Sequence, residues 1–386
     1  MTDPSGFAPT EYQARCDAAQ QMMDAAGLDA LLLTTEADLR YFSGFLTRFW
    51  ESPTRPWFLI LPAQGKPVAV IPEIGAHLMG RTWIDDIRTW RAPDYSDDGV
   101  SLLAGTLHEL AGPRGRIGLP SGMESHLGMP LADFRRLERE LPDASLTDDA
   151  GILRALRLIK SPAEMARIEE ACAIGDRAFS RVPEIAGRGV PLSKIFRDFQ
   201  RLCLEEGADF VPYLAGGAGQ TGYGDVISPA TDLPLEHGDM LMLDTGLIRA
   251  GYFCDFNRNF CVGPCPAPLQ SAHDRLIDAV TAGAEAARPG ALASDIFAAM
   301  DAVLTGGSGD PGAGRYGHGL GMQLTEWPSI LPADRTGLRP GMVLTLEPSI
   351  ATGPGTLLVH EEVIAVTDGA ARFLTARMEG PVPALP

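Results

Sequence analysis

The segment DMLMLDTGLIRAGYFCDFNRNF (239–260) places two aspartates inside two apolar, strand-like arms. The arms flank a polar turn, Arg249-Ala250-Gly251, and a hairpin centred between residues 249 and 250 sets Asp244 directly opposite Asp255. Their Cβ atoms would then be about 5 Å apart on one face of the sheet. Like charges at that distance repel, and Asp is a poor strand former. The pair therefore requires a compensating partner.

A second apolar hairpin repeats this arrangement. Its arms, MVLTLEPSI (342–350) and TLLVHEEVIAV (356–366), flank the turn Gly353-Pro354-Gly355. When the hairpin is centred on Pro354, Glu347 faces Glu361. One carboxylate pair could be a coincidence of register, but two pairs indicate that the four carboxylates belong to a common site.

Four carboxylates in an apolar setting are costly unless cations share the space. Two divalent metal ions would neutralise them, and oxygen ligands suit hard ions such as Mn²⁺ or Mg²⁺. A nitrogen ligand extends the choice to Co²⁺, Fe²⁺ or Zn²⁺. The best candidate is His318 in YGHGLGMQL, where the neighbouring glycines allow close backbone approach. For the other six histidines a structural role is the better interpretation.

The length of 386 residues exceeds what one compact core usually holds, so we expect two domains. Strands alternating with helices predict an α/β first domain over residues 1–152. Residues 153–386 predict an α+β domain in which a helix pair and apolar hairpins occur twice, as in an internal duplication. The glycine-rich stretch 306–314 lacks the Lys-Ser/Thr of a phosphate-binding loop and is interpreted as a flexible loop. The expected helices are 10–26, 99–111, 129–141, 162–184, 192–207, 267–287 and 292–305, and the expected strands of the first domain are 30–34, 57–61, 68–71 and 116–120.

The charge balance restricts the partners. Fifty acidic residues against 32 basic ones give a net charge of -18, which argues against nucleic acid and anionic membranes. No apolar run reaches 18 residues, and the first 13 residues have no secretory signal pattern. The six cysteines lack metal-ligand spacing and are expected to be reduced, mostly buried thiols. These features predict a soluble cytoplasmic protein.

Five positions of the sequence resemble the ligand set of the pita-bread metallopeptidases, the family of prolidase, aminopeptidase P, methionine aminopeptidase and creatinase. The spacings between these positions, 11, 63, 29 and 14 residues, fit that family. The segment RLIKSPAEMARIEEA (157–171) also resembles the entry helix of its catalytic domain. The five positions are Asp244 in LDTG, Asp255 in CDFNRNF, His318 in GHGLG, Glu347 in LEPSI and Glu361 in HEEVIAVT.

The resemblance covers roughly residues 155–380 and implies a C-terminal pita-bread domain with a pseudo-twofold duplication. The first domain is similar in layout to the N-terminal domain of the prolidase, aminopeptidase P and creatinase branch. The family layout also implies a homodimer.

The resemblance implies two divalent metal ions, with manganese favoured. Asp244 would chelate one ion, Asp255 and Glu361 would bridge both, and His318 and Glu347 would complete the other. A hydroxide held between the ions attacks the scissile carbonyl in this family. Glu347 and His318 are therefore the catalytic candidates, with Glu347 as the proton acceptor for that water.

Two departures from the family bear on the substrate. Proline-specific members carry a His about 17 residues before the first Asp, but GYGDVISPAT (222–231) has none. They carry another His about seven residues after the ligand His, where this chain has Thr325-Glu326. The metal site resembles the family more closely than the peptide-handling residues do.

The predicted function is metal-dependent hydrolysis of the C–N (peptide) bond of a short peptide, as in Xaa-Pro dipeptidase and aminopeptidase. The alternative is a non-peptide C–N hydrolase, similar to creatinase or ectoine hydrolase, or a lyase acting on a small zwitterion. A non-enzymatic protein-binding module is less favoured, because relatives of that kind lack the ligands and this chain keeps all five positions.

The first domain adds candidate substrate residues in SGFLTRFWESPTRPW (43–57). In the creatinase branch, an arginine from the matching region reaches the partner subunit's site and binds a substrate carboxylate. Arg can clamp a carboxylate in bidentate fashion, and Trp can stack on a cation. A solvated loop with a buried Trp explains each residue equally well. The candidate substrate-binding residues are Arg48, Trp50, Arg55 and Glu326.

Overall fold

The computed structural model describes residues 6–51, 55–309 and 314–386. The chain divides into two compact units, residues 1–157 and 158–386. The expected boundary lay between residues 152 and 153, whereas the division falls near the end of helix α6 (Ile152–Leu158). The glycine-rich loop 306–314 and the segment 43–57 lie partly outside the described residues.

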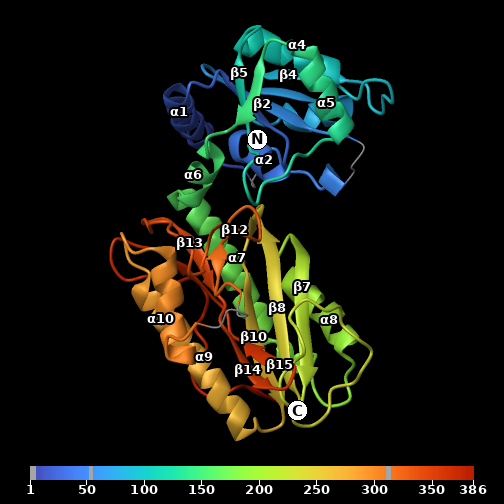
Figure 1. Cartoon of the computed structure of the whole chain (residues 1–386). Coiled ribbons are helices and arrows are strands. Elements are labelled where there is room, and N and C mark those ends of the chain that lie inside the picture. The colour runs from blue at the N-terminus through green and yellow to red at the C-terminus, as the bar shows by residue number, and fades with distance from the viewer. Residues whose placement is uncertain (1–5, 52–54, 310–313) are drawn as a thin grey trace. The chain divides into compact units, whose positions relative to one another are not determined.

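A six-stranded mixed sheet forms the first unit, with the strand order β4-β3-β2-β1-β5-β6. Strands β1, β2 and β3 are buried at every position, as expected for a sheet covered on both faces. Figure 1 shows this sheet among the blue and cyan elements. The strands are β1 (Ala30–Leu33), β2 (Phe58–Pro62), β3 (Val68–Pro72), β4 (Asp86–Trp90), β5 (Arg116–Leu119) and β6 (Ser145–Asp148).

Helices α1, α4 and α5 of the first unit begin and end close to the predicted positions, whereas the short helices α2 and α3 were not predicted. Helix α1 ends where Gly27 adopts the left-handed conformation (φ 67°), which a residue without a Cβ adopts at no steric cost. Helix α4 packs against β1, β2 and β4, and α5 packs against α4. The helices are α1 (Pro9–Ala26), α2 (Glu36–Ser43), α3 (Ala76–Met79), α4 (Val100–Ala111) and α5 (Leu131–Glu140).

The second unit repeats one order of elements, a helix pair followed by antiparallel strands. The first half forms a sheet in the order β18-β10-β8-β7, and the second half forms one in the order β12-β11-β13-β16-β17. The first half comprises α7 (Pro162–Ser180), α8 (Leu192–Glu205), β7 (Phe210–Gly219), β8 (Met240–Arg249), β9 (Tyr252–Phe253) and β10 (Phe256–Val262). The second half comprises α9 (Ala267–Ala286), α10 (Ala293–Thr305), β11 (His318–Gly319), β12 (Glu326–Ser329), β13 (Val343–Leu346), β14 (Ser349–Gly353), β15 (Thr356–Val359), β16 (Glu362–Ala365) and β17 (Arg372–Phe373), and β18 (Ala384–Leu385) joins the first sheet.

The helices cover the strands of the second unit. Helices α7 and α8 contact β8 and β7, respectively, and α9 contacts β13, β14 and β15. In Figure 1 the strands therefore lie between the green helices and the orange helices. Met240, Met242, Leu344 and Ile364 belong to the buried core of this unit. The carboxylate-bearing strands are thus held in a rigid, packed frame.

The register of the first hairpin differs from the prediction. Arg249 pairs with Tyr252 and Asp244 pairs with Asn257, so Asp255 is not the residue opposite Asp244. The two-residue turn consists of Ala250 (φ 48°) and Gly251 (φ 80°), which centres the hairpin one residue further along. Asp255 is instead a diagonal neighbour of Asp244, and diagonal pairs on one face still interact.

The register of the second hairpin is the predicted one. Leu346 pairs with Glu362 on one side of the carboxylates, and Ser349 pairs with Val359 on the other. Glu347 and Glu361 occupy the irregular stretch between these two ladders. An interruption of the pairing at this point leaves both side chains available to the site rather than to the sheet.

Two further expectations concern the whole chain. No helix within the described ranges combines the length and apolarity that a membrane span requires. All six cysteines are free thiols, and five of them are buried.

Candidate metal centre

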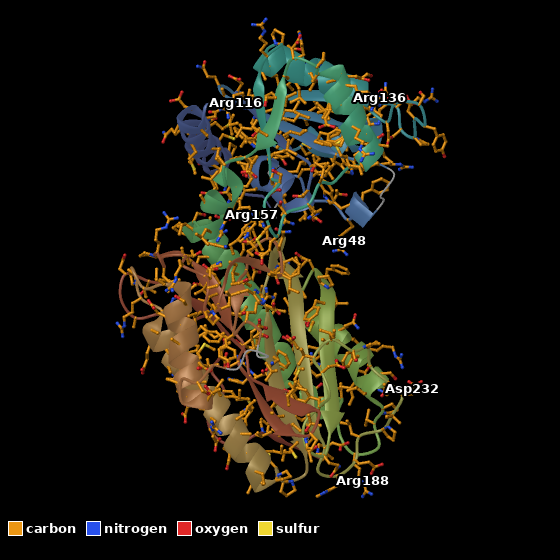
Figure 2. The ribbon with its side chains drawn as sticks, in the orientation of Figure 1. Arg48, Arg116, Arg136, Arg157, Arg188 and Asp232 are labelled. Atoms are coloured by element: carbon orange, nitrogen blue, oxygen red, sulfur yellow. The ribbon has the colours of Figure 1, made fainter. Side chains whose placement is uncertain are left out.

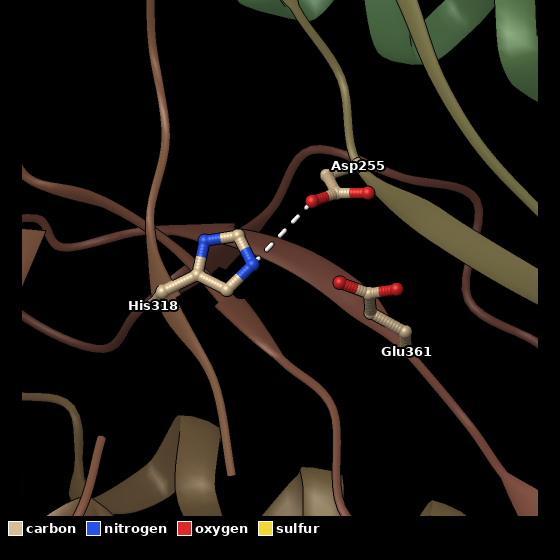
Figure 3. Close-up of side chains that lie close together, drawn as sticks. All are labelled: Asp255, His318 and Glu361. Carbon is tan, nitrogen blue, oxygen red and sulfur yellow. Dashed lines mark ion pairs between the residues drawn. The ribbon is translucent and has the colours of Figure 1, made fainter. Parts of the chain in front are cut away.

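The five ligand positions predicted from the sequence meet within the second unit. Asp244 lies on β8, and Asp255 follows β9. The other half supplies His318 at the start of β11, together with Glu347 and Glu361 at strand ends. One ligand atom each from Asp255, His318 and Glu361 lie within 4.8 Å of one another, and all three residues are buried. Figure 3 shows these three side chains pointing toward one another from separate chain segments.

His318 has a defined orientation. Its Nδ1 lies 2.8 Å from the carbonyl oxygen of Gly319, so Nδ1 carries the proton and donates it there. Its Nε2 lies 3.4 Å from Asp255 Oδ2 and 3.8 Å from Glu347 Oε1. The ring therefore presents the Nε2 lone pair to the carboxylates, as a metal-ligating imidazole does. The dashed line in Figure 3 marks the contact with Asp255.

The neighbouring glycines allow the close backbone approach that the sequence predicts. A Cβ at Gly317 would lie 2.1 Å from the carbonyl oxygen of Thr345, and one at Gly319 would lie 2.0 Å from that of Trp327. Both distances are far shorter than any real Cβ contact. A side chain at either position would push the histidine loop off the sheet.

Some carboxylate oxygens of the cluster have no hydrogen-bond donor. Tyr213 on β7 donates to Asp244 Oδ2 at 3.1 Å, but Asp244 Oδ1 and Glu361 Oε1 are buried without a donor. Buried polar atoms are almost always satisfied in native proteins. A cation between these oxygens would supply the missing interaction.

The electrostatics agree with that interpretation. Burial raises the pKa of Asp255 well above its usual range, and the neighbouring charge of Glu347 adds to the rise. Burial and the charge of Asp255 likewise raise the pKa of Asp244 and of Glu361. Divalent cations would stabilise the ionised forms, so the donor set of four carboxylates and one imidazole fits a pair of divalent metal ions.

Comparisons with known proteins agree with the fold and with this site. The model of the metallopeptidase family M24 matches residues 166–368, more than half of the chain. The chain belongs to metallopeptidase family M24. The creatinase/prolidase N-terminal domain matches residues 15–159.

Three relatives span nearly the same length as this chain. The probable dipeptidase PepE of Mycobacterium tuberculosis is 29% identical over 93% of both chains. The Xaa-Pro dipeptidase of Pyrococcus horikoshii is 24% identical over 93% of this chain and 96% of its own length. The ectoine hydrolase of Halomonas elongata is 25% identical over 94% and 95%, respectively.

A solved structure extends the likeness to three dimensions. The crystal structure of the dipeptidase PepE from Mycobacterium ulcerans superposes with a TM-score of 0.84, covering 99% of this chain and all of that one at 27% identity. The family resemblance, the fold class and the metallohydrolase class predicted from the sequence are thereby confirmed. Enzymes of family M24 use a dinuclear divalent-metal site, and the ligand cluster described above could hold such a site.

The sequence analysis missed two residues that contact the cluster, Tyr213 and Arg315. Tyr213 lies on β7 and donates a hydrogen bond to Asp244. Because no strand was predicted over residues 210–219, this contact with β8 was not expected. Arg315 Nε lies 3.4 Å from Glu347 Oε1, and its Nη2 donates to Thr325 Oγ1 at 3.3 Å. The sequence signal that could have identified Arg315 is its position three residues before His318, in the same loop.

Glu326 is engaged in a buried ion pair. Lys160 Nζ lies 2.9 Å from Glu326 Oε2, and both side chains are only 2% exposed. Glu326 Oε1 accepts the backbone N–H groups of Met322 (2.9 Å) and Gln323 (3.1 Å). These contacts fix the loop that follows His318, and they favour a structural role for Glu326 over the predicted substrate contact.

The remaining substrate candidates belong to the first unit. Arg48 is exposed on that unit, where Figure 2 labels it. The Trp50 ring lies 5.9 Å from that of Trp57, and the Arg55 guanidinium lies 5.0 Å from the Phe49 ring. These contacts form an aromatic cluster within the unit, and a substrate role for Arg48, Trp50 and Arg55 stays a prediction.

Proposed function

We propose that this chain is a dinuclear-metal dipeptidase of the Xaa-Pro type, which hydrolyses the C–N bond of a short peptide. The observation that carries the proposal is the buried cluster of Asp255, His318 and Glu361, whose ligand atoms lie within 4.8 Å of one another. Asp244 and Glu347 complete the cluster, and the unsatisfied oxygens of Asp244 and Glu361 face no other donor in the described structure. The names of two relatives, a probable dipeptidase and an Xaa-Pro dipeptidase, support the same reaction.

In this proposal the five residues hold two divalent ions. Asp244, Asp255, His318, Glu347 and Glu361 would supply the ligands of both ions. Manganese is favoured because four of the five donors are carboxylates, while the imidazole nitrogen also admits Co²⁺, Fe²⁺ or Zn²⁺. Bound ions would lower the pKa of a water molecule and polarise the scissile carbonyl.

The chain's own residues would then position the substrate and move the proton. The Glu347 side chain is 26% exposed, whereas Asp255 and His318 are 6% and 3% exposed, so the cluster opens on the side of Glu347. Glu347 is therefore placed to accept the proton of the attacking water. Tyr213 keeps Asp244 oriented through its hydrogen bond, as partners of metal ligands generally do.

A cytoplasmic location and a homodimer belong to the same proposal. The free, mostly buried thiols are typical of a reducing compartment. The dimer follows from the resemblance to the prolidase and creatinase branch.

A second candidate function is hydrolysis of a small non-peptide C–N bond. Thr325 and the segment 222–231 lack the two histidines of proline-specific relatives. The ectoine hydrolase is as similar to this chain as the Xaa-Pro dipeptidase is. The two functions differ in the substrate that is turned over, so one screen separates them.

The test is turnover by full-length protein reconstituted with Mn²⁺ against Ala-Pro, creatine and ectoine. We expect hydrolysis of Ala-Pro, and Glu361→Gln should lose both activity and bound metal. Asp232→Asn is the matched control, because Asp232 is an exposed carboxylate of the same unit and should leave both readouts unchanged. Turnover of ectoine or creatine alone would replace the dipeptidase proposal, and an active, metal-replete Glu361→Gln protein would refute the bridging role.

A further inference from the structure

Asn257 occupies the position directly across the sheet from Asp244. The observed register pairs Asn257 on β10 with Asp244 on β8. Directly paired residues of antiparallel strands extend their side chains from the same face, with Cβ atoms about 4.5–5.5 Å apart. Asp255 precedes Asn257 by two residues and is the diagonal neighbour of Asp244 on that face. The carboxamide of Asn257 therefore lies on the face of the sheet that carries both aspartates of the cluster.

The oxygen of this carboxamide lacks a hydrogen-bond partner. Asn257 is 1% exposed, and its Oδ1 is buried with no donor among the residues that the structure describes. On the facing strand, Asp244 Oδ1 is likewise buried without a donor. An amide oxygen and a carboxylate oxygen are both acceptors, so neither can satisfy the other, and buried acceptors in native proteins are almost always satisfied. The two facing oxygens therefore share the need for a positive partner.

Asn259, two residues further along β10, shows how a structural asparagine is satisfied in the same strand. Its Nδ2 donates to the carbonyl oxygen of Val359 at 2.6 Å, and its Oδ1 accepts from the Tyr223 hydroxyl at 3.2 Å. Asn259 is completely buried, so burial alone does not leave the oxygen of an asparagine without a donor. The two asparagines differ in their surroundings, because Asn257 faces Asp244 whereas Asn259 faces Met242.

The cationic side chain next to Asn257 does not serve this oxygen. Arg258 is the following residue of β10, so its side chain extends from the opposite face. Its Nη1 donates to the backbone oxygens of Asn257 (2.8 Å) and Glu361 (3.0 Å). Its Nη2 donates to Glu362 Oε2 at 3.0 Å. A bound cation would supply the missing partner to the Asn257 carboxamide and to Asp244 together.

We propose that the carboxamide oxygen of Asn257 is a sixth metal ligand, which forms an all-oxygen end of the cluster with Asp244. The inference rests on the two-metal site of the proposed function. Carbonyl and carboxylate oxygens suit hard cations such as Mn²⁺ and Mg²⁺. The imidazole of His318 adds a nitrogen ligand, which also suits Co²⁺, Fe²⁺ and Zn²⁺. The end of the cluster at Asn257 therefore favours Mn²⁺ more strongly than the end at His318 does.

The competing explanation is that Asn257 acts as a hydrogen-bond donor. Rotated by half a turn, its carboxamide would present Nδ2 to Asp244 Oδ1 and orient that carboxylate without touching a metal ion. The two explanations differ in the effect of Asn257→Asp, because a carboxylate keeps the ligand oxygen but has no N–H group to donate. They also differ in whether the side chain of Asn257 is bonded to the ion.

The first test titrates metal-free, full-length protein with Mn²⁺ and follows the free ion by electron paramagnetic resonance. Wild-type protein should bind two ions. Asn257→Leu is similar in size but apolar, and it should weaken one ion about tenfold to a hundredfold, the range for one polar contact with a charged group, while the other ion stays. Asn257→Asp should bind both ions at least as tightly as wild type. Asn259→Leu is the matched control, which removes a carboxamide from the same strand and should keep both Mn²⁺ affinities.

The second test needs no substitution that could prevent folding. The chain contains two asparagines, Asn257 and Asn259, so labelling with asparagine that carries ¹³C in its carboxamide marks these two positions alone. Electron–nuclear double resonance of the Mn²⁺-loaded protein then reports a labelled carbon that is bonded to a metal-bound oxygen. We expect one strong ¹³C coupling in the wild-type protein, unchanged in Asn259→Leu and absent in Asn257→Leu.

Several results would overturn the inference. Wild-type Mn²⁺ affinities in Asn257→Leu, or an Asn257→Asp protein that binds as weakly as Asn257→Leu, would remove Asn257 from the ligand set. If wild-type protein binds two Mn²⁺ ions and hydrolyses Ala-Pro but shows no ¹³C coupling, the proposed function stands and this inference fails. If wild-type protein binds no Mn²⁺, both fail.

Discussion

The buried ion pair between Lys160 and Glu326 yields the sharpest prediction about stability. Both side chains are 2% exposed, and Glu326 also accepts two backbone N–H groups. Glu326→Gln keeps the shape and an oxygen acceptor but leaves the Lys160 ammonium without its buried counter-charge. Breaking a buried pair in this way costs about 3–5 kcal/mol. For a unit of about 230 residues, that corresponds to a fall in Tm of roughly 6–20 °C.

Thermal unfolding of full-length protein, followed by circular dichroism, measures this cost. The double variant Lys160→Met/Glu326→Gln should recover much of the lost Tm, because it removes the buried charge as well. Glu184→Gln is a matched control, since it removes an exposed partner of Arg181 and should leave the Tm nearly unchanged. The reasoning is refuted if Glu326→Gln melts within about 2 °C of wild type while raising KM for Ala-Pro, because Glu326 would then contact substrate.

Three further predictions follow from the pKa shifts and hydrogen bonds. Burial and mutual repulsion raise the pKa of Asp244, Asp255 and Glu361 above 3.8, 3.8 and 4.5, so the metal-free fold keeps protons that the unfolded chain has lost. Above pH 6.5, where His273 is neutral in both states, urea unfolding in EDTA should therefore show stability falling as pH rises toward 8, and Mn²⁺ should abolish that slope; an unchanged slope would contradict the site. Tyr213→Phe removes the donor to Asp244 and should weaken Mn²⁺ binding about tenfold to a hundredfold in a chelator competition. Equal affinity of variant and wild type would show that the hydrogen bond does not contribute to metal binding. Burial lowers the pKa of His273 from 6.5 to about 3, so the free energy of unfolding decreases as pH falls below 6.5. His273→Phe should flatten that decrease, and an equally steep decrease in the variant would contradict the assignment to His273.

Local signals in the sequence predicted most of the helices and drew attention to the five residues of the candidate metal centre, whose role as metal ligands stays a prediction. Helix α1 was expected at 10–26 and runs from Pro9 to Ala26, because the apolar period and the Gly27 stop are both local. The second hairpin has the predicted register, since Pro354 and its flanking glycines mark the turn clearly.

The first hairpin shows where local signals fail. Its register depends on Ala250 adopting a positive φ, a conformation that alanine rarely takes and that no residue pattern announces. The resulting shift replaced a directly opposed pair with a diagonal one, although both aspartates still reach the cluster. An error of this size changes the geometry of a site without changing its membership.

The residues that surround the cluster could not be predicted from the sequence for a different reason. Tyr213 precedes Asp244 by 31 residues, and Lys160 precedes Glu326 by 166. Only the packing of two strands or two segments brings each pair together. Such contacts are determined by tertiary structure, so residue spacing cannot reveal them.

The central claim is that Asp244, Asp255, His318, Glu347 and Glu361 hold two metal ions. Anomalous diffraction from crystals of full-length protein grown with Mn²⁺ tests it most directly. The account predicts two anomalous peaks within this cluster, with Asp255 and Glu361 contacting both. A single peak, or manganese bound elsewhere with these five side chains free of metal, would contradict it.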